Sequence, residues 1–224
     1  MSRAARLRTL LAIASILGAP ASAEAAEQKV SKQARKYLSM TPDDFKACTA
    51  IKDDSLDTIA VLNTSPCFQE KRGILGIVWN DNFLRAFIDK RTGATTYQVY
   101  QYISYQGDWR FYNRVNYESP VGPQSRDLTE IGRNVVSCSG SSLGGGCLLS
   151  ETIAFDAPES LLRIVASKFV PGAVQGWRFK YYSKSGQEWP DALGGAEVAG
   201  ILKAVDAYRA EHGLAAAPTE ALPK

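Results

Sequence analysis

The sequence predicts an α+β fold built on an antiparallel meander sheet of about five to seven strands, with helices at the N-terminus, in the middle and at the C-terminus. Alternation of apolar and polar residues typical of strands runs through most of residues 58–117. Glycine-containing turns typical of hairpins separate these strands. Helical periodicity occurs before and after the run of strands, which argues against a parallel α/β sheet.

The first 23 residues have the pattern of a secretory signal peptide. Arg3, Arg6 and Arg8 make a basic start, and residues 10–18 form an apolar run too short to span a bilayer. The small residues 21–23 (ASA) fit a cleavage site. We therefore expect a periplasmic or secreted protein.

The domain boundaries follow from this leader and from composition. We expect a single α+β domain over residues 24–213 and a disordered tail over residues 214–224, which are rich in alanine and proline. Loss of residues 1–23 leaves equal numbers of basic and acidic residues, although the whole chain has 26 and 23. This balance argues against a nucleic-acid partner, and the lack of a later long apolar run argues against a transmembrane segment.

Two helices are expected before the sheet. Residues 26–40 have a weak helical period that predicts a short amphipathic helix. Thr41 is a good N-cap, Pro42 suits the first helical position, and Asp44 follows Thr41 by three residues. This capping pattern predicts a second helix over residues 42–52.

The central part of the chain is predicted to form consecutive strands. We expect them at residues 58–62, 74–79, 83–88, 95–105 and 109–117. Residues 89–93 and 106–108 each contain a glycine and suit hairpin turns. The last three strands are therefore expected to lie side by side as an antiparallel meander.

The remaining elements complete the fold. Residues 131–138 and 148–155 are expected to pair as strands, and residues 177–182 and 187–189 to form a hairpin. The sequence DAPE at residues 156–159 has the spacing of a capping box and predicts a helix to about residue 168. A final amphipathic helix is expected over residues 197–211, ended by Gly213.

Four cysteines in an exported chain predict two disulfides. We expect the local pairing of Cys48 with Cys67 and of Cys138 with Cys147, each stabilising the fold by about 3 kcal/mol through closure of a short loop. A zinc site is the alternative, but the chain has no CxxC motif and no histidine near the cysteines. We therefore expect no metal and no cofactor.

One motif suggests nucleophilic catalysis, but its context does not support it. Residues 140–144 (GSSLG) match G-x-S-x-G, and His212 follows later in the chain. A nucleophile elbow needs a helix directly after the motif, whereas here more glycines and a predicted strand follow. His212 is the only histidine and lies at a predicted helix end. No catalytic residue is assigned.

Carboxylate pairs leave a second enzymatic hypothesis open. Asp53, Asp54 and Asp57 lie close together in the sequence, and Asp81 and Asp89 lie near predicted strand ends. Glycoside hydrolysis needs only two suitably spaced carboxyl groups. A carboxylate-dependent hydrolase of envelope polymers is therefore an alternative, although such clusters are more often solvated turns.

The strongest functional signal is the density of aromatic residues between positions 97 and 117. Strand alternation places Tyr97, Val99, Ile103 and Tyr105 on one face, expected to be core, and Tyr100 and Tyr102 on the other. The next predicted strand adds polar and aromatic side chains. The predicted ligand-binding residues are Tyr100, Tyr102, Arg110, Tyr112 and Arg114.

Such a mixed surface suits a glycan, a polar peptide or an envelope protein, because tyrosine offers both a stacking face and a hydroxyl group. The hypothesis is thus a non-catalytic binding or interaction module of the cell envelope. The alternative for these tyrosines is that helices cover both faces of the sheet, or that the residues simply favour strands. A further alternative is an inhibitor-like protein that uses the disulfide-closed loop 138–147.

Overall fold

The computed structural model describes most of the chain from Ser31 onward. The described ranges are residues 31–69, 71–72, 77–78, 80–138, 146–173 and 176–215. The predicted signal peptide, the GSSLG motif and most of the predicted tail lie outside these ranges and stay predictions.

The two N-terminal helices are present. Helix α1 (Lys32–Ser39) begins after Ser31, whose side chain accepts a hydrogen bond from Ala34 N. Helix α2 (Pro42–Cys48) begins with the predicted capping box, in which Thr41 and Asp44 bond reciprocally. The helix ends four residues before the predicted position 52, because Thr49 turns to an extended conformation and the chain then enters a strand.

The larger sheet has six antiparallel strands in the order β1-β2-β5-β6-β10-β9. Its strands are β1 (Ala50–Lys52), β2 (Ile59–Asn63), β5 (Asn80–Asp89), β6 (Thr95–Gln106), β10 (Cys147–Ala157) and β9 (Thr129–Cys138). Two short strands, β3 (Lys71–Arg72) and β4 (Ile77–Val78), pair separately. The predicted strand at residues 74–79 falls largely outside the described residues.

A second antiparallel sheet has four strands in the order β12-β11-β7-β8. Its strands are β7 (Tyr112–Tyr117), β8 (Gln124–Asp127), β11 (Trp177–Ser183) and β12 (Glu188–Leu193). The α+β class with antiparallel sheets is therefore confirmed. The predicted three-stranded meander is wrong in its last strand, since β6 pairs with β10 and β7 belongs to the second sheet.

The chain passes from the six-stranded sheet to the four-stranded sheet at Phe111. This residue has φ of 57°, a left-handed conformation that is uncommon for an aromatic residue. The backbone amides of Phe111 and Tyr112 donate to the buried carboxylate of Glu151 on β10, over 2.9 and 3.1 Å. The Tyr105 hydroxyl also donates to Glu151. These bonds direct the chain away from β6, which hairpin patterns alone do not indicate.

Two further helices follow the sheets in sequence. Helix α3 (Glu159–Ser167) is present, but its predicted capping box is wrong: Pro158 is the N-cap and gives no side-chain bond. Asp156 instead lies in β10, where it accepts a hydrogen bond from Gln98. Helix α4 (Gly195–Glu211) matches the predicted final helix, and Gly213 follows it with φ of 64°.

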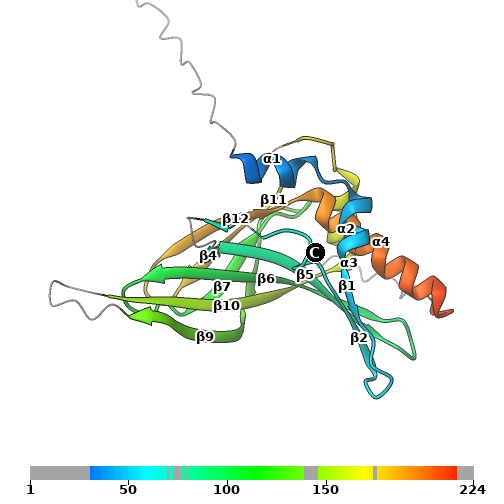
Figure 1. The fold of residues 1–224 in the computed structure, drawn as a ribbon, viewed down its shortest axis with the longest axis horizontal. Helices are drawn as coiled ribbons and strands as arrows, with labels where there is room; N and C mark the ends of the chain where they lie inside the picture. Colours follow the sequence, from blue (N-terminus) through cyan, green and yellow to red (C-terminus); the bar gives the residue numbers. More distant parts are fainter. Residues whose placement is uncertain are drawn as a thin grey trace, which may run out of the picture. The chain divides into compact units, whose positions relative to one another are not determined.

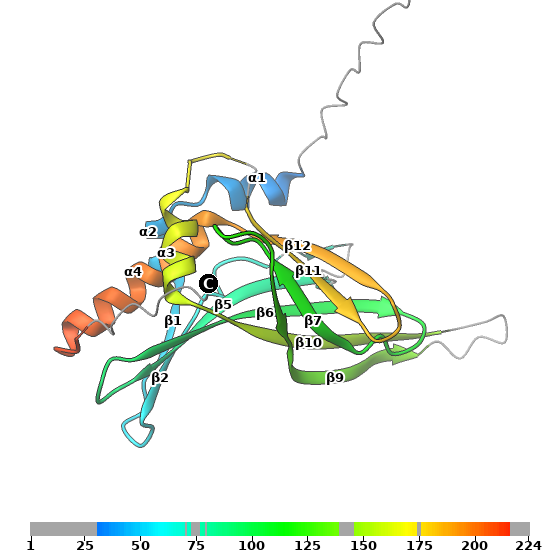
Figure 2. The same ribbon diagram turned by 180° about the vertical axis from the view of Figure 1, so that it is seen from behind.

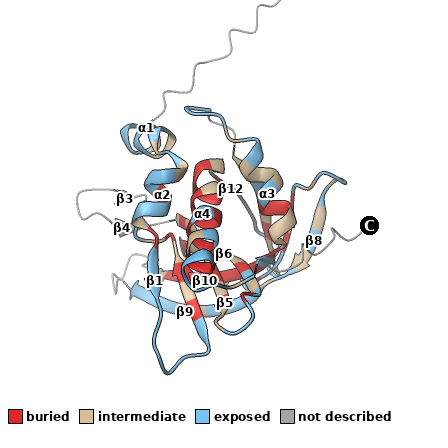
Figure 3. Cartoon of the chain, turned by 90° about the vertical axis from the view of Figure 1, so that its right-hand side faces the viewer, coloured by how far each residue is buried: buried red, intermediate tan, exposed pale blue. Residues whose placement is uncertain are grey.

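The helices and the four-stranded sheet lie on the same side of the six-stranded sheet (Figures 1 and 2). Buried residues of α4 and of the strands beneath it lie together in this interior (Figure 3). The core next to α4 is aliphatic, with Leu62 and Leu84 from the sheet and Ile201 and Val205 from the helix. The core between the sheets is aromatic and includes Tyr117, Phe155, Trp177, Phe179 and Tyr181.

Both predicted disulfides are present. Cys48 bonds to Cys67 across 19 positions and ties α2 to the segment after β2. Cys138 bonds to Cys147 across nine positions and joins the paired ends of β9 and β10. Residues 139–145, inside the second loop, lie outside the described ranges.

Candidate functional site

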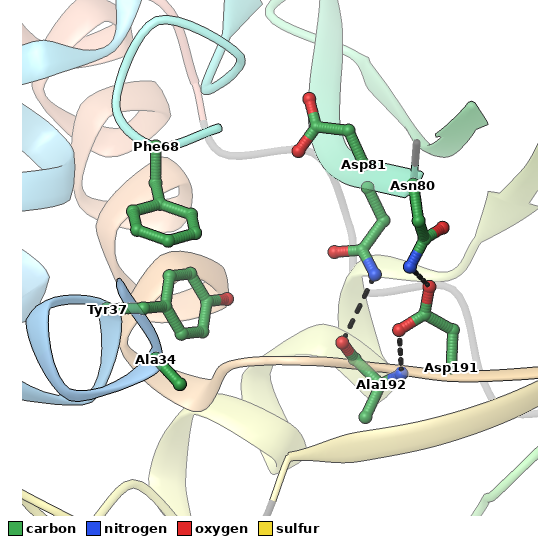
Figure 4. A pocket seen from close by; sticks show the side chains of 8 residues that line it. Ala34, Tyr37, Phe68, Asn80, Asp81, Asp191 and Ala192 are labelled. Atoms are coloured by element: carbon green, nitrogen blue, oxygen red, sulfur yellow. Dashed lines mark hydrogen bonds between the residues drawn. The ribbon is translucent and has the colours of Figure 1, made fainter. Parts of the chain in front are cut away.

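A pocket of about 160 Å³ lies where α1, the segment after β2, the start of β5 and the end of β12 come together (Figure 4). Its described lining residues are Ala34, Tyr37, Phe68, Asn80, Asp81, Asn82, Asp191 and Ala192. The two sheets meet here, since Asn80 Nδ2 donates to Asp191 Oδ2 over 2.9 Å and Asn82 Nδ2 donates to the Ala192 carbonyl over 3.2 Å.

One wall of the pocket is aromatic. The rings of Tyr37 and Phe68 have centroids 4.9 Å apart and planes inclined by 53°. Phe45, which is fully buried, packs edge-on against Tyr37. The Tyr37 hydroxyl donates to Glu197 Oε2 over 2.9 Å and accepts from Gly194 N over 2.8 Å. These bonds anchor the exposed helix α1 to the core and fix the orientation of the Tyr37 ring.

Glu197 is the buried carboxylate behind this aromatic wall. It is 3% exposed, and Thr64 Oγ1 donates to its Oε1 over 2.5 Å while Tyr37 occupies Oε2. Burial raises the pKa of Glu197 to about 7, although hydrogen bonds from Thr64 and Tyr37 act in the opposite direction. The negative charge of Asp81 raises this pKa further. Each oxygen of Glu197 thus accepts a hydrogen bond from a hydroxyl group, and the bond from Tyr37 holds that ring in place.

The opposite wall is polar. Asn80 lies at its centre: its Nδ2 donates to Asp191, and its Oδ1 accepts from the fully buried Gln101. Carboxylate and carbonyl oxygens only accept, so the bonds to Asp191 and Ala192 O fix which end of each asparagine amide is nitrogen. The acceptors of this wall therefore include the Asp191 carboxylate and the Asn82 side-chain oxygen.

The lining residues carry negative charge. Asp81 and Asp191 are acidic, and no described lining residue is basic. The charge of Asp191 adds to the effect of burial in raising the pKa of Tyr181, and it contributes weakly to the raised pKa of Tyr37. The pocket therefore has an aromatic side and an acceptor side that includes the carboxylate of Asp191.

The sequence-predicted site is divided by the structure. Tyr100 and Tyr102 alternate along β6 with the core residues Val99 and Ile103, so they lie on the outer face of the six-stranded sheet. Tyr100 is only 5% exposed, because Phe83 stacks on it at 5.2 Å and the guanidinium group of Arg85 lies 4.3 Å from its ring centre. Tyr102 is half-buried.

The other three predicted residues lie at or in the four-stranded sheet. Tyr112 is buried in the core, and its hydroxyl accepts from Arg110 Nη1 over 3.2 Å. Arg114 is exposed and stacks on Tyr182. The expectation of one shared surface is wrong, because it placed β7 beside β6. Whether any of these residues binds a ligand stays a prediction.

Most of the pocket was not predicted from the sequence. Asp81 is among the acids predicted near strand ends, but Tyr37, Phe68, Asn80 and Asp191 were not predicted as site residues. The sequence NDN at residues 80–82 gives a weak signal, since three polar residues open a long strand. Its partner Asp191 is 111 positions away from Asn80, and no local pattern indicates that contact.

The other acidic candidates have structural roles. Asp53 pairs with Lys90 at 2.6 Å and accepts from the Tyr208 hydroxyl, which keeps its pKa below the usual value. Asp89 accepts from the amides of Arg91 and Thr92 within its own turn. Within the described ranges, no three His, Cys, Asp or Glu side chains are grouped to hold a metal ion.

No described helix is long and apolar enough to cross a membrane. Comparison of the chain with protein-family models, with curated proteins and with solved structures found no match. The case for a function therefore depends on the residues and geometry of the chain itself.

Proposed function

We propose that the chain is an exported, non-catalytic binding module whose pocket between α1, β5 and β12 receives a small polar group of a ligand. The observation that carries the proposal is the opposition of the Tyr37 and Phe68 rings to the polar wall around Asp191. An aromatic face with a few convergent polar groups is typical of sites that orient small ligands.

Hydrogen bonds hold side chains of the pocket in fixed orientations, which supports binding. Tyr37 is held by Glu197 and Gly194, and Asp191 is held by Asn80 and by the amide of Ala192. Groups that are already oriented lose little conformational entropy when a ligand arrives. The export part of the proposal has separate support, namely the leader-like residues 1–23 and two disulfides, which form in oxidising compartments.

The alternative hydrolase and inhibitor hypotheses have weaker support. Glu197 has the raised pKa of a general acid, but Thr64 and Tyr37 occupy its oxygens. The inhibitor hypothesis depends on residues 139–145, which lie outside the described ranges. Both therefore stay predictions of the sequence.

Native mass spectrometry tests the proposed function. The protein is exported in its own host, purified without denaturant, and measured native and denatured. We expect an added small mass only in the native spectrum. Ala34→Trp should remove this mass by placing a large side chain at the pocket, whereas Ala210→Trp, on an exposed position of α4, should retain it. Equal retention by both variants would place the ligand elsewhere, and a bare wild-type protein would count against a retained ligand.

A further inference from the structure

We infer that the group received by this pocket is the cationic end of a basic side chain, an arginine guanidinium or a lysine ammonium, presented by a peptide or protein partner. This inference rests on the proposed function and names the class of its ligand. It follows from the hydrogen-bonding character, the charge and the size of the pocket.

The polar wall favours a ligand that donates hydrogen bonds. The amide nitrogens of Asn80 and Asn82 already donate within the wall, to Asp191 and to Ala192 O. Asn82 Oδ1 accepts none of the hydrogen bonds found among the described residues, and Asp191 uses one bond at each carboxylate oxygen. A carboxylate offers about four lone-pair sites. Acceptor capacity therefore remains at this wall for N–H groups of a ligand.

The charge of the wall selects among possible donors. Asp191 carries a carboxylate on this wall, and no basic residue is among the described lining residues. A carboxylate attracts a cationic donor and disfavours an anionic ligand, and a charge-assisted hydrogen bond is about twice as strong as a neutral one. Gln101 Oε1, buried behind Asn80, has no partner among the described residues and adds another acceptor dipole near this wall.

The aromatic wall is suited to the same kind of ligand. Tyr37 and Phe68 lie across the pocket from the asparagine and aspartate side chains (Figure 4). The face of an aromatic ring attracts an ammonium or guanidinium group, and this attraction grows when water is excluded. A cation between the two walls would contact a ring on one side and carboxylate oxygens on the other.

The size of the pocket suits a cation at the end of a longer molecule. Sites for drug-sized ligands have volumes of about 300 to 1,000 Å³. This pocket, at about 160 Å³, is smaller and accommodates an end group rather than a whole ligand of that size. A lysine or arginine side chain supplies such an end group on a flexible apolar stem.

Titration by NMR with blocked tripeptides tests this inference. The probes are Gly-Arg-Gly, Gly-Lys-Gly and Gly-citrulline-Gly, in which citrulline has nearly the shape of arginine but no charge. We expect saturable shifts at the amides of Ala34, Asp81 and Ala192 with at least one basic peptide. Binding of the citrulline peptide should be at least tenfold weaker than binding of the arginine peptide if arginine is the ligand.

Two protein variants assign the effect to the pocket. Asp191→Asn should weaken binding of the basic peptide at least tenfold, because the charge-assisted bonds are lost. Asp108→Asn makes the same change of charge at an exposed turn outside the pocket and should change affinity less than twofold. If Asp191→Asn fails to fold, Phe68→Leu provides a second test and should weaken binding about threefold.

Each outcome decides the inference. Binding of only the arginine or only the lysine peptide supports it and identifies the cation. Equal binding of the citrulline peptide, or unchanged affinity in Asp191→Asn, would overturn it. Absence of binding by both basic peptides would also overturn it. In that case, a small mass that Ala34→Trp removes in native mass spectrometry would still support the proposed pocket, with another class of ligand.

Discussion

Glu197 is a buried acid whose ionisation opposes folding at neutral and higher pH. Its pKa in the folded protein is about 7, compared with an ordinary value of 4.5. Because the folded value is the higher one, the folded state binds the proton more tightly. The stabilising contribution is complete below about pH 4.5 and is lost as the pH rises through 7, a difference of about 3 kcal/mol.

Glu197→Gln should therefore remove this part of the pH dependence of stability. Urea unfolding at pH 4.5 and pH 8 is the measurement, and we expect the variant to be more stable than the wild type at pH 8 by up to about 3 kcal/mol. The two proteins should differ little at pH 4.5. Glu211→Gln, at an exposed position of the same helix, is the control. Parallel pH profiles for wild type and Glu197→Gln would contradict the assignment.

Single residues also mark the limit of prediction from the sequence. Strand alternation correctly predicted that Tyr97, Val99, Ile103 and Tyr105 are buried together. It did not predict the burial of Tyr100 on the other face, which depends on stacking by residues of the neighbouring strand. Alternation specifies the face of a side chain, whereas exposure depends on what packs there.

At the scale of elements, the turn into β7 depends on Glu151. Glu151→Gln would replace one carboxylate oxygen by an amide group that cannot accept from a backbone N–H, so Phe111 N or Tyr112 N would lose its acceptor. We expect a loss of unfolding free energy of about 2 kcal/mol, measured in urea. Glu130→Gln is a matched control, because exposed Glu130 also pairs with Arg133. Equal losses in both variants would contradict the role of Glu151.

The contact between α2 and α4 depends on the absence of a side chain at Gly200. A Cβ atom there would collide with Phe45 Cβ and lie 2.9 Å from Pro42 O. Alanine favours helices by about 1 kcal/mol over glycine, but we expect Gly200→Ala to destabilise the protein by roughly 1 to 3 kcal/mol. Thermal and urea unfolding measure this. Gly132→Ala is the control, because a Cβ atom there would meet open space, and it should change stability by less than about 0.5 kcal/mol. An increase in stability in Gly200→Ala would contradict the packing.

Two exposed apolar residues of the edge strand β9 lie at irregularities in its pairing. The register between β9 and β10 shifts twice, which leaves Ile131 and Val136 without opposite partners. Both side chains are exposed. Bulges of this kind protect a long edge strand from pairing with other chains. The hairpin prediction gave the pairing of β9 with β10, but apolar alternation cannot indicate where an extra residue interrupts it.

At the scale of the whole molecule, local patterns predicted the elements better than their assembly. The α+β class, both disulfides, the first capping box and the final helix were predictable, because each depends on nearby residues. The division into two sheets was not, since it depends on Glu151 and Phe111, 40 positions apart. The pocket was hidden for the same reason, because its walls come from distant segments.

The two disulfides should contribute differently to the whole molecule. The bond between Cys48 and Cys67 fixes α2, which packs on α4, whereas the bond between Cys138 and Cys147 joins strand ends that are already paired. Chain-entropy estimates give about 3 kcal/mol for each, slightly more for the longer loop. We therefore expect replacement of Cys48 and Cys67 by serine to lower the unfolding free energy more than replacement of Cys138 and Cys147.

Urea unfolding of the two double-serine variants measures this difference, and hydrogen exchange locates it. In the variant without the Cys48–Cys67 bond, amide protection should fall in α2 and at its contacts with α4, because side-chain packing and the exposed Asp43–Lys203 ion pair then hold α2. In the other variant, the loss should be confined to the ends of β9 and β10. If removal of the second bond instead lowers protection throughout both sheets, that short loop is the stronger constraint on the fold.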